Sequence, residues 1–565
     1  RIVLTKDDDM IITGKRNPFE NSYRVGFDDE GRILALEIEL YSDGGAYADL
    51  STAIMERAML HCDNAYYLPN VHIEGQVCRT HFHPHTAFRG FGGPKGVATI
   101  EKIIEEIAFA IGKDPLQIRK INCYSDENGK NITPYGQILK NNCLPKLFSQ
   151  LENECQYQKR RKEIEKHNAR VISGESESRK ILGLSVTAVK FGISFTTRFL
   201  NQANAMVIVH RDGSLQVSTG ATEMGQGVNA RIGELVASEL GLERSMVRLM
   251  PTRTDKNANT SPTAASSGTD LNGAAALLAT RKIKARLSRV ALRLLDLPEA
   301  RWAKNTAGLG SELEILPDEV NLPSDDPNAR TSWVSGVATF HGIKFEKGQV
   351  FHEAVPRKKI SFATLVDEAY LNRVSLSDYA HYRFRGLAFN KLTGQGHAFL
   401  YFTQGVGASE VSIDLDTGDV RVVRADLLMD LGRPINEGLD IGQVTGGYVQ
   451  GLGWVTTEKL FYSDKGLLLS HSPSTYKIPN VQDTPRIFNV RLLENDENHE
   501  NVRGTKTVGE PPLLLAIGAW TAIHDALKHL PHWQKKYPQI ELPATQEQVL
   551  RAIYPDRFKK WELRK

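Results

Sequence analysis

The chain has 565 residues, of which 41% are hydrophobic and 24% are charged, and its 70 basic residues nearly balance its 67 acidic ones. This length exceeds a single hydrophobic core and predicts about two to four domains. The near-neutral charge argues against nucleic-acid binding, and without a long apolar run or a signal-peptide pattern we expect no membrane contact and a cytoplasmic location.

Four tight turns between alternating apolar runs predict β-hairpins. The first lies within residues 20–45, and the others lie at residues 207–217, 416–419 and 463–466. Helical segments separate them. The expected fold class is therefore α+β with mixed sheets, not a doubly wound parallel sheet.

Apolar residues recur at helical spacing between these hairpins. The stripe from Ile100 to Ile111 predicts a helix ended by Gly112, and Asp114-Pro115 predicts the start of the next helix. Further helices are expected around residues 232–240 and 272–295. Residues 305–335 are rich in Gly, Pro, Asp, Asn and Ser, which predicts a surface excursion.

Two charged regions stand apart from the rest of the chain. Residues 131–180 predict a helical charged linker, in which Lys159-Arg160-Arg161-Lys162 is either a basic docking patch or, as interleaved glutamates favour, a solvated helix face. Residues 536–565 turn basic and polar and predict a C-terminal tail. The five cysteines lack CxxC spacing, which excludes a zinc ribbon or a cysteine-held iron–sulfur cluster in this chain.

A glycine-rich turn at residues 86–96 is the first of five candidate ligand-binding stretches. It places Arg89 between Phe88 and Phe91 just before a helix. An arginine can hold a phosphate or a polar ring through two hydrogen bonds, and a helix N-terminus suits an anion. One aromatic ring can face a planar substrate; an equally weighted alternative puts both rings in the core.

Three further stretches place small and polar residues at predicted helix starts. Residues 219–227 contain Gln226 and suit a polyanionic, heteroaromatic ligand, and residues 260–270 suit a phosphate. Hydroxyl capping is the favoured alternative for the latter, and close helix packing is favoured for residues 440–447, which contain Gln443.

The fifth stretch, residues 507–515, holds Glu510 between a glycine and two prolines, ahead of an apolar run. A carboxylate on rigid, poorly solvated backbone suits general-base catalysis, and a helix N-terminal cap is the equally weighted alternative. No P-loop, HExxH, GxSxG or EF-hand pattern occurs.

Seven segments resemble, in this order, motifs of the xanthine dehydrogenase and xanthine oxidase family of molybdenum hydroxylases. They are T-A-F-R-G-F-G-G-P (86–94), K-F-G-I-S-F (190–195), T-E-M-G-Q-G (222–227), S-P-T-A-A-S (261–266), D-I-G-Q-V (440–444), P-S-T-Y-K-I-P (473–479) and V-G-E-P-P (508–512). The resemblance covers about residues 1–530. It implies two elongated mixed-sheet domains, residues 1–130 (the C-terminal half of the first) and 181–535, with a molybdenum-molybdopterin cofactor in its Mo=S form between them.

The resemblance also implies an activity and roles for residues. The implied reaction is hydroxylation of purines, hypoxanthine to xanthine to urate, with water as the oxygen source and Glu510 as the general base. Implied substrate contacts are Arg57, Phe91, Phe195, Thr196, Leu50 and Leu200, and residues close to molybdenum are Arg89 and Ala265. Implied cofactor contacts are Phe88, Met224, Gly225, Gln226, Ala264, Ser266, Thr269 and Gln443. Family members specialised for aldehydes lack an arginine at the position of Arg57, so the presence of this arginine favours a purine as the substrate.

A family segment with a second active-site glutamate would precede Arg1, and the chain begins without methionine, so we expect a fragment or processed piece. The expected partners are a chain or segment carrying the N-terminal part of the molybdenum domain, 2Fe-2S and FAD on other domains or subunits, and a small-molecule purine. A dimer of the assembled unit is expected. The alternatives are an aldehyde or other N-heterocycle hydroxylase, and a non-catalytic assembly subunit.

Overall fold

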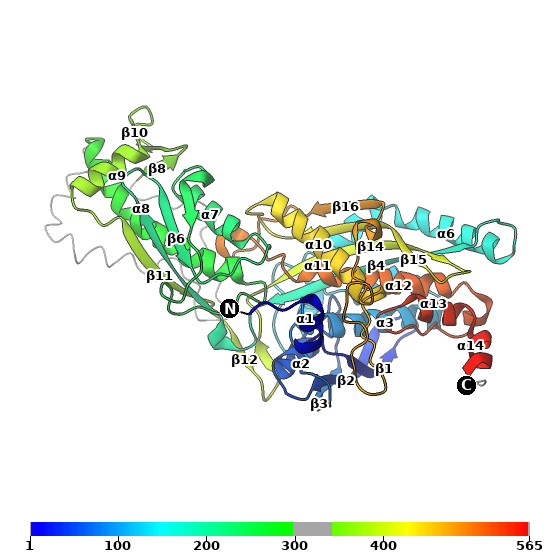
Figure 1. Ribbon diagram of the computed structural model, residues 1–565. Helices are drawn as coiled ribbons and strands as arrows, with labels where there is room; N and C mark the ends of the chain where they lie inside the picture. The colour runs from blue at the N-terminus through cyan, green and yellow to red at the C-terminus, as the bar shows by residue number, and fades with distance from the viewer. Residues whose placement is uncertain (1, 298–341, 563–565) are drawn as a thin grey trace.

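One four-stranded sheet carries the larger body of the molecule (Figure 1). The computed structural model, which describes residues 2–297 and 342–562, orders its strands β16-β15-β14-β4. They are β4 (Lys180–Ile193), β14 (Tyr401–Asp414), β15 (Val420–Asp430) and β16 (Ile487–Leu492). β14 pairs antiparallel with β4 and β15, whereas β16 pairs parallel with β15. The sheet thus joins segments that are distant in sequence.

Strand β4 separates two hydrophobic cores. Leu184 belongs to a core that also holds Ile100, whereas Phe191 belongs to a core that also holds Trp520. Successive strand residues face opposite sides, so a nearly continuous apolar strand indicates a sheet that is covered on both faces.

Helices and a second sheet cover these faces. α12 (Ile517–Leu527) packs along β4 and β14, and α3 (Gly93–Ile111) contributes to both cores. The N-terminal sheet has the order β1-β2-β3, with β1 (Phe19–Phe27), β2 (Ile33–Gly45) and β3 (Val71–Arg79). α2 (Ser51–Met59) packs on this sheet and on α3, and α4 (Pro115–Asn122) follows α3. α2 thereby reaches β4, the edge strand of the central sheet.

A smaller lobe lies at the left of Figure 1 and has its own core. Its sheet has the order β11-β5-β6-β7, formed by β5 (Gln202–Val209), β6 (Leu215–Thr219), β7 (Val247–Leu249) and β11 (Ser377–Arg383). α7 (Val228–Glu239) and α8 (Ala274–Leu294) pack on it, and β8 (Ile343–Glu346), β9 (Gln349–His352), β10 (Lys359–Ser361) and α9 (Phe362–Leu371) lie at its far end. Only residues 194–201 separate β4 of the body from β5 of the lobe.

Most predicted elements are present, and the α+β class with mixed sheets is confirmed. Three predicted hairpins pair as β1–β2, β5–β6 and β14–β15. The fourth is a tight turn closed by a single bridge between Tyr462 and Leu468. α3 ends at Gly112 in a left-handed conformation, and the Asp114 carboxylate accepts the Leu116 N–H at the start of α4.

The charged segment 131–180 is helical as predicted, but its basic run is not the solvated helix face that we favoured. It contains α5 (Leu144–Glu154) and α6 (Tyr157–Ile172), which pack on the central sheet. Two residues of its basic run, Arg160 and Arg161, are buried rather than solvated. Arg160 pairs with Glu410, and Arg161 Nη1 lies 2.6 Å from Asp525 Oδ2. A helical turn directs only part of a four-residue run to solvent, and acidic residues of the body meet the rest.

The C-terminal segment also packs on the body. It forms α13 (Gln546–Ile553) and α14 (Pro555–Glu562), and Val549 and Ile553 are buried in the core that holds Trp520. Because basic residues dominate the composition of this segment, the sequence did not reveal the apolar face of α13.

The predicted excursion at 305–335 lies outside the described residues, and the domain boundaries stay a prediction. Within the described ranges, no helix has the length and apolarity needed to cross a membrane.

Candidate functional site

The glycine-rich turn before α3 has a backbone shaped by close contacts. Gly90 and Gly92 have φ of 95° and 93°, and a Cβ on Gly92 would lie 2.0 Å from the Ile54 carbonyl oxygen. Such positions admit only glycine. Phe91 between them also takes a left-handed conformation, with φ of 46°. These backbone constraints therefore fix the direction in which the Arg89 side chain leaves the turn.

Arg89 links segments that are more than 350 residues away in sequence. Its Nε donates to Gly509 O at 2.6 Å and its Nη1 to Gln450 Oε1 at 3.1 Å. Its Nη2 donates to both oxygens of Gln443, each at 3.3 Å. Burial lowers the pKa of the guanidinium, and the nearby charge of Glu510 opposes that shift. The guanidinium thus holds four acceptor oxygens, which belong to three residues.

Glu510 is held between two of the predicted stretches. It is the N-cap residue of α11 (Pro511–Leu514) and is half-buried. Its Oε1 accepts the Gly90 N–H at 3.1 Å and its Oε2 accepts the Ser266 hydroxyl at 2.8 Å. The Ser266 Oγ in turn accepts the Glu510 N–H at 2.9 Å. The carboxylate is therefore fixed on both oxygens.

The 260–270 stretch reaches Glu510 through an unusual backbone. Ala265 and Ser266 have φ of 50° and 55°, consecutive left-handed residues that turn the Ser266 side chain toward Glu510. Ala265 is buried, Ser266 and Thr269 are half-buried, and Ala264 is exposed. Thr507 donates its hydroxyl to Ser266 O. The Ser266 hydroxyl is therefore used by the predicted base, and phosphate binding by this stretch stays a prediction.

The side chains of Glu223 and Gln226 hold the 222–229 loop through hydrogen bonds within the loop itself. Glu223 accepts the N–H groups of Gly225, Gly227 and Asn229 at 2.9–3.0 Å. The Gln226 side chain accepts the Met224 N–H and donates to the Thr222 carbonyl. Met224 is 67% exposed. The predicted cofactor residues of this loop thus stand at the surface on a rigid local frame.

Gln443 lies in α10 (Glu437–Thr456), whose glycines allow close approach. A Cβ on Gly447 would lie 3.0 Å from Arg89 Nη2 and one on Gly451 would lie 2.4 Å from Leu513 O. The close helix packing favoured for this stretch is therefore present. A Cβ on Gly442 or Gly446 would meet no atom of the described chain within 4 Å.

Arg57 is buried where α2 meets the C-terminal end of β4. Its Nη1 donates to Gly192 O at 2.9 Å and its Nη2 donates to Ser194 O. The guanidinium lies 5.2 Å from the Phe191 ring centroid, a cation–π distance. Burial lowers its pKa, opposed by the charges of Glu510 and Glu56. Arg57 is thus a buried cation within the field of the predicted base.

The segment that joins β4 to β5 carries three of the predicted substrate residues, Phe195, Thr196 and Leu200. The Phe195 N–H donates to Asn201 Oδ1 at 2.8 Å, and Thr196 Oγ1 donates to Glu56 Oε2 at 3.0 Å. Leu200 is half-buried, and Leu50, just before α2, is 43% exposed. Of these side chains, that of Thr196 is tied to Glu56, the neighbour of Arg57 in α2.

The two aromatic residues beside Arg89 are both partly exposed, so neither is a core residue. Arg16 lies behind them: its guanidinium is 4.3 Å from the Phe88 ring centroid and its Nη2 donates to Arg89 O at 3.0 Å. Phe91 has no such partner among the ring contacts of the described chain. The contact with Arg16 restrains Phe88 more than Phe91.

The structure joins some predicted residues directly and others only through intermediates. Arg89, Gln443, Ser266 and Glu510 form one continuous hydrogen-bonded network. The 222–229 loop is connected to it by the Arg231–Asp440 ion pair between α7 and α10, and by the Thr222 N–H, which donates to Thr263 Oγ1 in the 260–270 stretch. Sequence reasoning missed Gln450, one turn beyond the predicted helix stretch, and Glu56, whose signal is its position next to Arg57.

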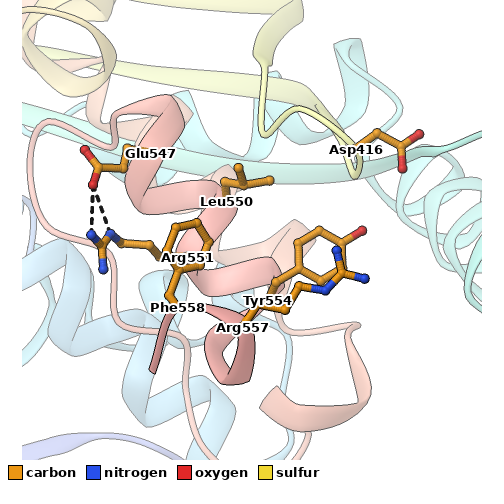
Figure 2. A pocket seen from close by; sticks show the side chains of 7 residues that line it. All are labelled: Asp416, Glu547, Leu550, Arg551, Tyr554, Arg557 and Phe558. Atoms are coloured by element: carbon orange, nitrogen blue, oxygen red, sulfur yellow. Dashed lines mark hydrogen bonds and ion pairs between the residues drawn. The ribbon is translucent and has the colours of Figure 1, made fainter. Parts of the chain in front are cut away.

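Two of the hollows in the described chain lie away from this network. One of about 330 Å³ lies between α13, α14 and the β14–β15 turn (Figure 2), lined by Asp416, Glu547, Leu550, Arg551, Tyr554, Arg557 and Phe558. Another of about 1070 Å³ includes Cys143, Arg433 and Glu437. Neither is lined by a predicted site residue. Within the described ranges, no group of three or more His, Cys, Asp or Glu side chains is arranged to hold a metal ion.

Comparison with known families matches most of the chain. The family description "Molybdopterin cofactor-binding domain" matches residues 1–123, and a second model of the same description matches residues 150–310 and 336–485. These matches include every predicted site residue except Glu510.

Similar curated proteins are longer than this chain. Xanthine dehydrogenase 1 of Arabidopsis thaliana is 36% identical over 570 residues, which are 98% of this chain and 36% of that protein. Xanthine dehydrogenase/oxidase of Mus musculus is 37% identical over 580 residues, 100% of this chain and 38% of that protein. The chain therefore spans little more than a third of the length of these relatives.

Solved structures show the same fold. Quinoline 2-oxidoreductase from Pseudomonas putida 86 superposes with a TM-score of 0.78 at 23% identity, covering 98% of this chain and 64% of that one. CO dehydrogenase from Oligotropha carboxidovorans superposes with a TM-score of 0.77 at 19% identity, covering 100% and 64%. The match of molybdopterin-binding models to more than half of its residues, supported by the 36% identity to a xanthine dehydrogenase, shows that the chain belongs to the molybdenum hydroxylase family.

Proposed function

We propose that, within the complete protein, this chain takes part in molybdenum-dependent hydroxylation of purines, hypoxanthine to xanthine to urate, with water as the oxygen source. The observation that carries the proposal is the Glu510 carboxylate. It is held by the Gly90 N–H and the Ser266 hydroxyl directly beside the Arg89–Gln443 network. A base must be oriented before it can accept a proton efficiently, and these two donors supply that orientation.

The residues beside Glu510 fit a molybdenum-molybdopterin cofactor. Gly442 and Gly446 leave open backbone on both sides of Gln443, and Gly225 leaves open backbone in the opposite loop. Bare backbone next to amide and guanidinium donors suits a flat, anionic group. The described residues supply no cluster of metal ligands, so a metal held here needs ligands from such a cofactor.

In its Mo=S form, the cofactor would supply the oxygen-transfer and two-electron oxidation chemistry. Glu510 would take the proton from the water that provides the oxygen atom. Arg57 places a buried positive charge in the field of Glu510, where it would stabilise negative charge that develops on an oxopurine ring. Phe91 and Phe195 would hold the flat ring by offset or edge-on contact, with Leu50 and Leu200 as apolar walls.

One observation favours a second candidate. Both terminal nitrogens of Arg57 already donate to the carbonyls of Gly192 and Ser194. A guanidinium engaged in this way has less capacity for a substrate carbonyl, which favours an aldehyde or another N-heterocycle. Turnover of an aldehyde but not of xanthine would support this candidate.

The partners follow from the same proposal. Electrons removed from the substrate must leave the site, and the described residues hold no cysteine cluster for iron and sulfur. We therefore place the 2Fe-2S clusters and FAD, as well as the N-terminal part of the molybdenum domain, on other segments or subunits. A dimer of the assembled unit completes the proposal.

Glu510→Gln in the complete protein tests the proposal. The amide keeps the shape of the carboxylate but cannot accept the proton, so kcat for urate formation should fall by about 10²–10⁴-fold while molybdenum stays near one per chain. Glu437→Gln, an exposed carboxylate on α10, serves as the matched control. Urate formation that survives Glu510→Gln would refute the role of Glu510, and an assembled wild type without molybdenum would favour the assembly subunit.

A further inference from the structure

A lysine, a glutamate and a threonine form a polar chain beside the proposed substrate position. Lys391 Nζ lies 2.9 Å from Glu56 Oε2, and Thr196 Oγ1 donates to the same oxygen at 3.0 Å. Glu56 precedes Arg57 on α2. Lys391 follows β12 (Ala388–Asn390) in a hairpin with β13 (Gln395–His397), and the hairpin lies near α2 in Figure 1. Two segments more than 330 residues apart thus meet at Thr196.

The exposure of this pair shows that it contributes little to the fold. The Lys391 side chain is 52% exposed and that of Glu56 is 18% exposed. An ion pair with one largely exposed partner adds little to stability. Its charges act instead on whatever approaches Thr196, because a fixed charge changes the local concentration of charged ligands.

The hydrogen bonds also define what Thr196 offers to a ligand. Its proton is directed to Glu56, so toward other groups the hydroxyl acts as an acceptor, which suits a ring N–H. An unbalanced Glu56 carboxylate at this point would repel an anion. Lys391 supplies the balancing charge.

We propose that Lys391 is a specificity-determining residue that allows anionic oxopurines to bind next to Thr196 by balancing the charge of Glu56. The inference rests on the proposed purine hydroxylation and names the charge state of the substrate. It predicts opposite effects for the two partners: loss of Lys391 weakens the binding of anions, whereas loss of the Glu56 charge strengthens it.

The test is titration calorimetry on the complete, molybdenum-loaded protein, with urate as the anion and hypoxanthine as the neutral ring. Lys391→Gln should raise the Kd for urate by about five- to tenfold and that for hypoxanthine by less than about twofold. Glu56→Gln should lower the Kd for urate, and Lys391→Arg should restore wild-type binding. Lys344→Gln removes the ion pair of a similarly exposed lysine in β8, at the far end of the lobe, and should change neither Kd.

Equal shifts for urate and hypoxanthine, or weaker urate binding in both Lys391→Gln and Glu56→Gln, would overturn the inference. Failure of the proposed function is a separate result, namely a wild type that binds neither purine. In that case benzoate and benzamide, a planar anion and its neutral analogue, replace the purines. If Lys391→Gln raises the Kd for benzoate and Glu56→Gln lowers it, the role of Lys391 in charge selection is supported. Equal Kd shifts for benzoate and benzamide refute it.

Discussion

The Arg89–Glu510 network and the 222–229 loop differ in how far apart in sequence their hydrogen-bond partners lie. Arg89 donates to residues 354 and 420 positions away in sequence. In the loop, Glu223 accepts from backbone groups at most six residues away. Both regions belong to the proposed cofactor site, yet the first exists only when the whole body is folded, while the second is organised locally.

This difference has an energetic consequence. A long-range network leaves several buried groups without partners when one member is removed, whereas a local loop can exchange a lost hydrogen bond for one with water. Substitutions in the network should therefore affect the whole protein, and substitutions in the loop should affect only the loop and what it binds.

The largest effect is expected for Arg89→Ala. Gly509, Gln450 and Gln443 would lose their donor together, so the free energy of unfolding should fall by about 3–5 kcal/mol. The molybdenum content should fall with it. Denaturant unfolding and elemental analysis of the complete protein measure both, with the exposed Arg433→Ala as the control. A variant that keeps its stability and its metal would show that the network is not needed to hold the site.

A smaller effect involves Asp270, which is connected to the network through Tyr401. Burial raises the pKa of Asp270 to about 6, and the hydrogen bonds from Tyr401 and Asn501 oppose that shift. The folded state therefore binds this proton more tightly than the unfolded state. The resulting stability is fully present below the ordinary pKa of 3.8 and is lost as the pH rises through about 6, a change of about 3 kcal/mol.

Asp270→Asn keeps the acceptor for Tyr401 and removes the titration. Unfolding free energies measured from pH 4 to pH 7 should fall less steeply for the variant than for the wild type. The other titrating groups are common to both proteins, so they cancel in the difference. Parallel curves for the two proteins would contradict the raised pKa of Asp270.

The smallest effect is expected for Glu223→Gln in the loop. Burial raises the pKa of Glu223, but the N–H groups of Asn229, Gly227 and Gly225 outweigh it, so the pKa is lowered. Because the side chain is largely exposed, stability should change by less than about 1 kcal/mol. Hydrogen exchange at residues 225–229 should nevertheless become faster, with Glu243→Gln as an exposed control. Loss of global stability equal to that of Arg89→Ala would erase the distinction between the two regions.

Local chemistry explains why much of the fold was predictable. The β1–β2 and β5–β6 hairpins follow from turn residues between alternating runs, and the end of α3 follows from Gly112. In the charged segment 131–180, the expectation of a solvated helix face was wrong, because composition does not show which side of a helix packs on other elements. Arg160 and Arg161 are buried only because Glu410 and Asp525 meet them.

The motifs named the main residues of the proposed site, but not the contacts between them. Glu510, Arg89 and Gln443 stood out by residue type and glycine context, and the structure joins them. Glu56 and Lys391 carry no comparable signal, because a charged residue on a helix or a hairpin is usually at the surface. Their pairing next to Thr196 arises from the meeting of distant segments.

The sequence by itself determined the mixed fold class, the positions of most helices and hairpins, and the glycine-rich stretches that carry the family motifs, because each depends on residues within one or two turns of each other. Only the tertiary structure decided that Ser266 binds Glu510, that Arg57 donates to the end of β4, and that Lys391 balances Glu56. These contacts join residues 135 to 335 positions apart, and their energies depend on burial and charge that neighbouring sequence does not encode.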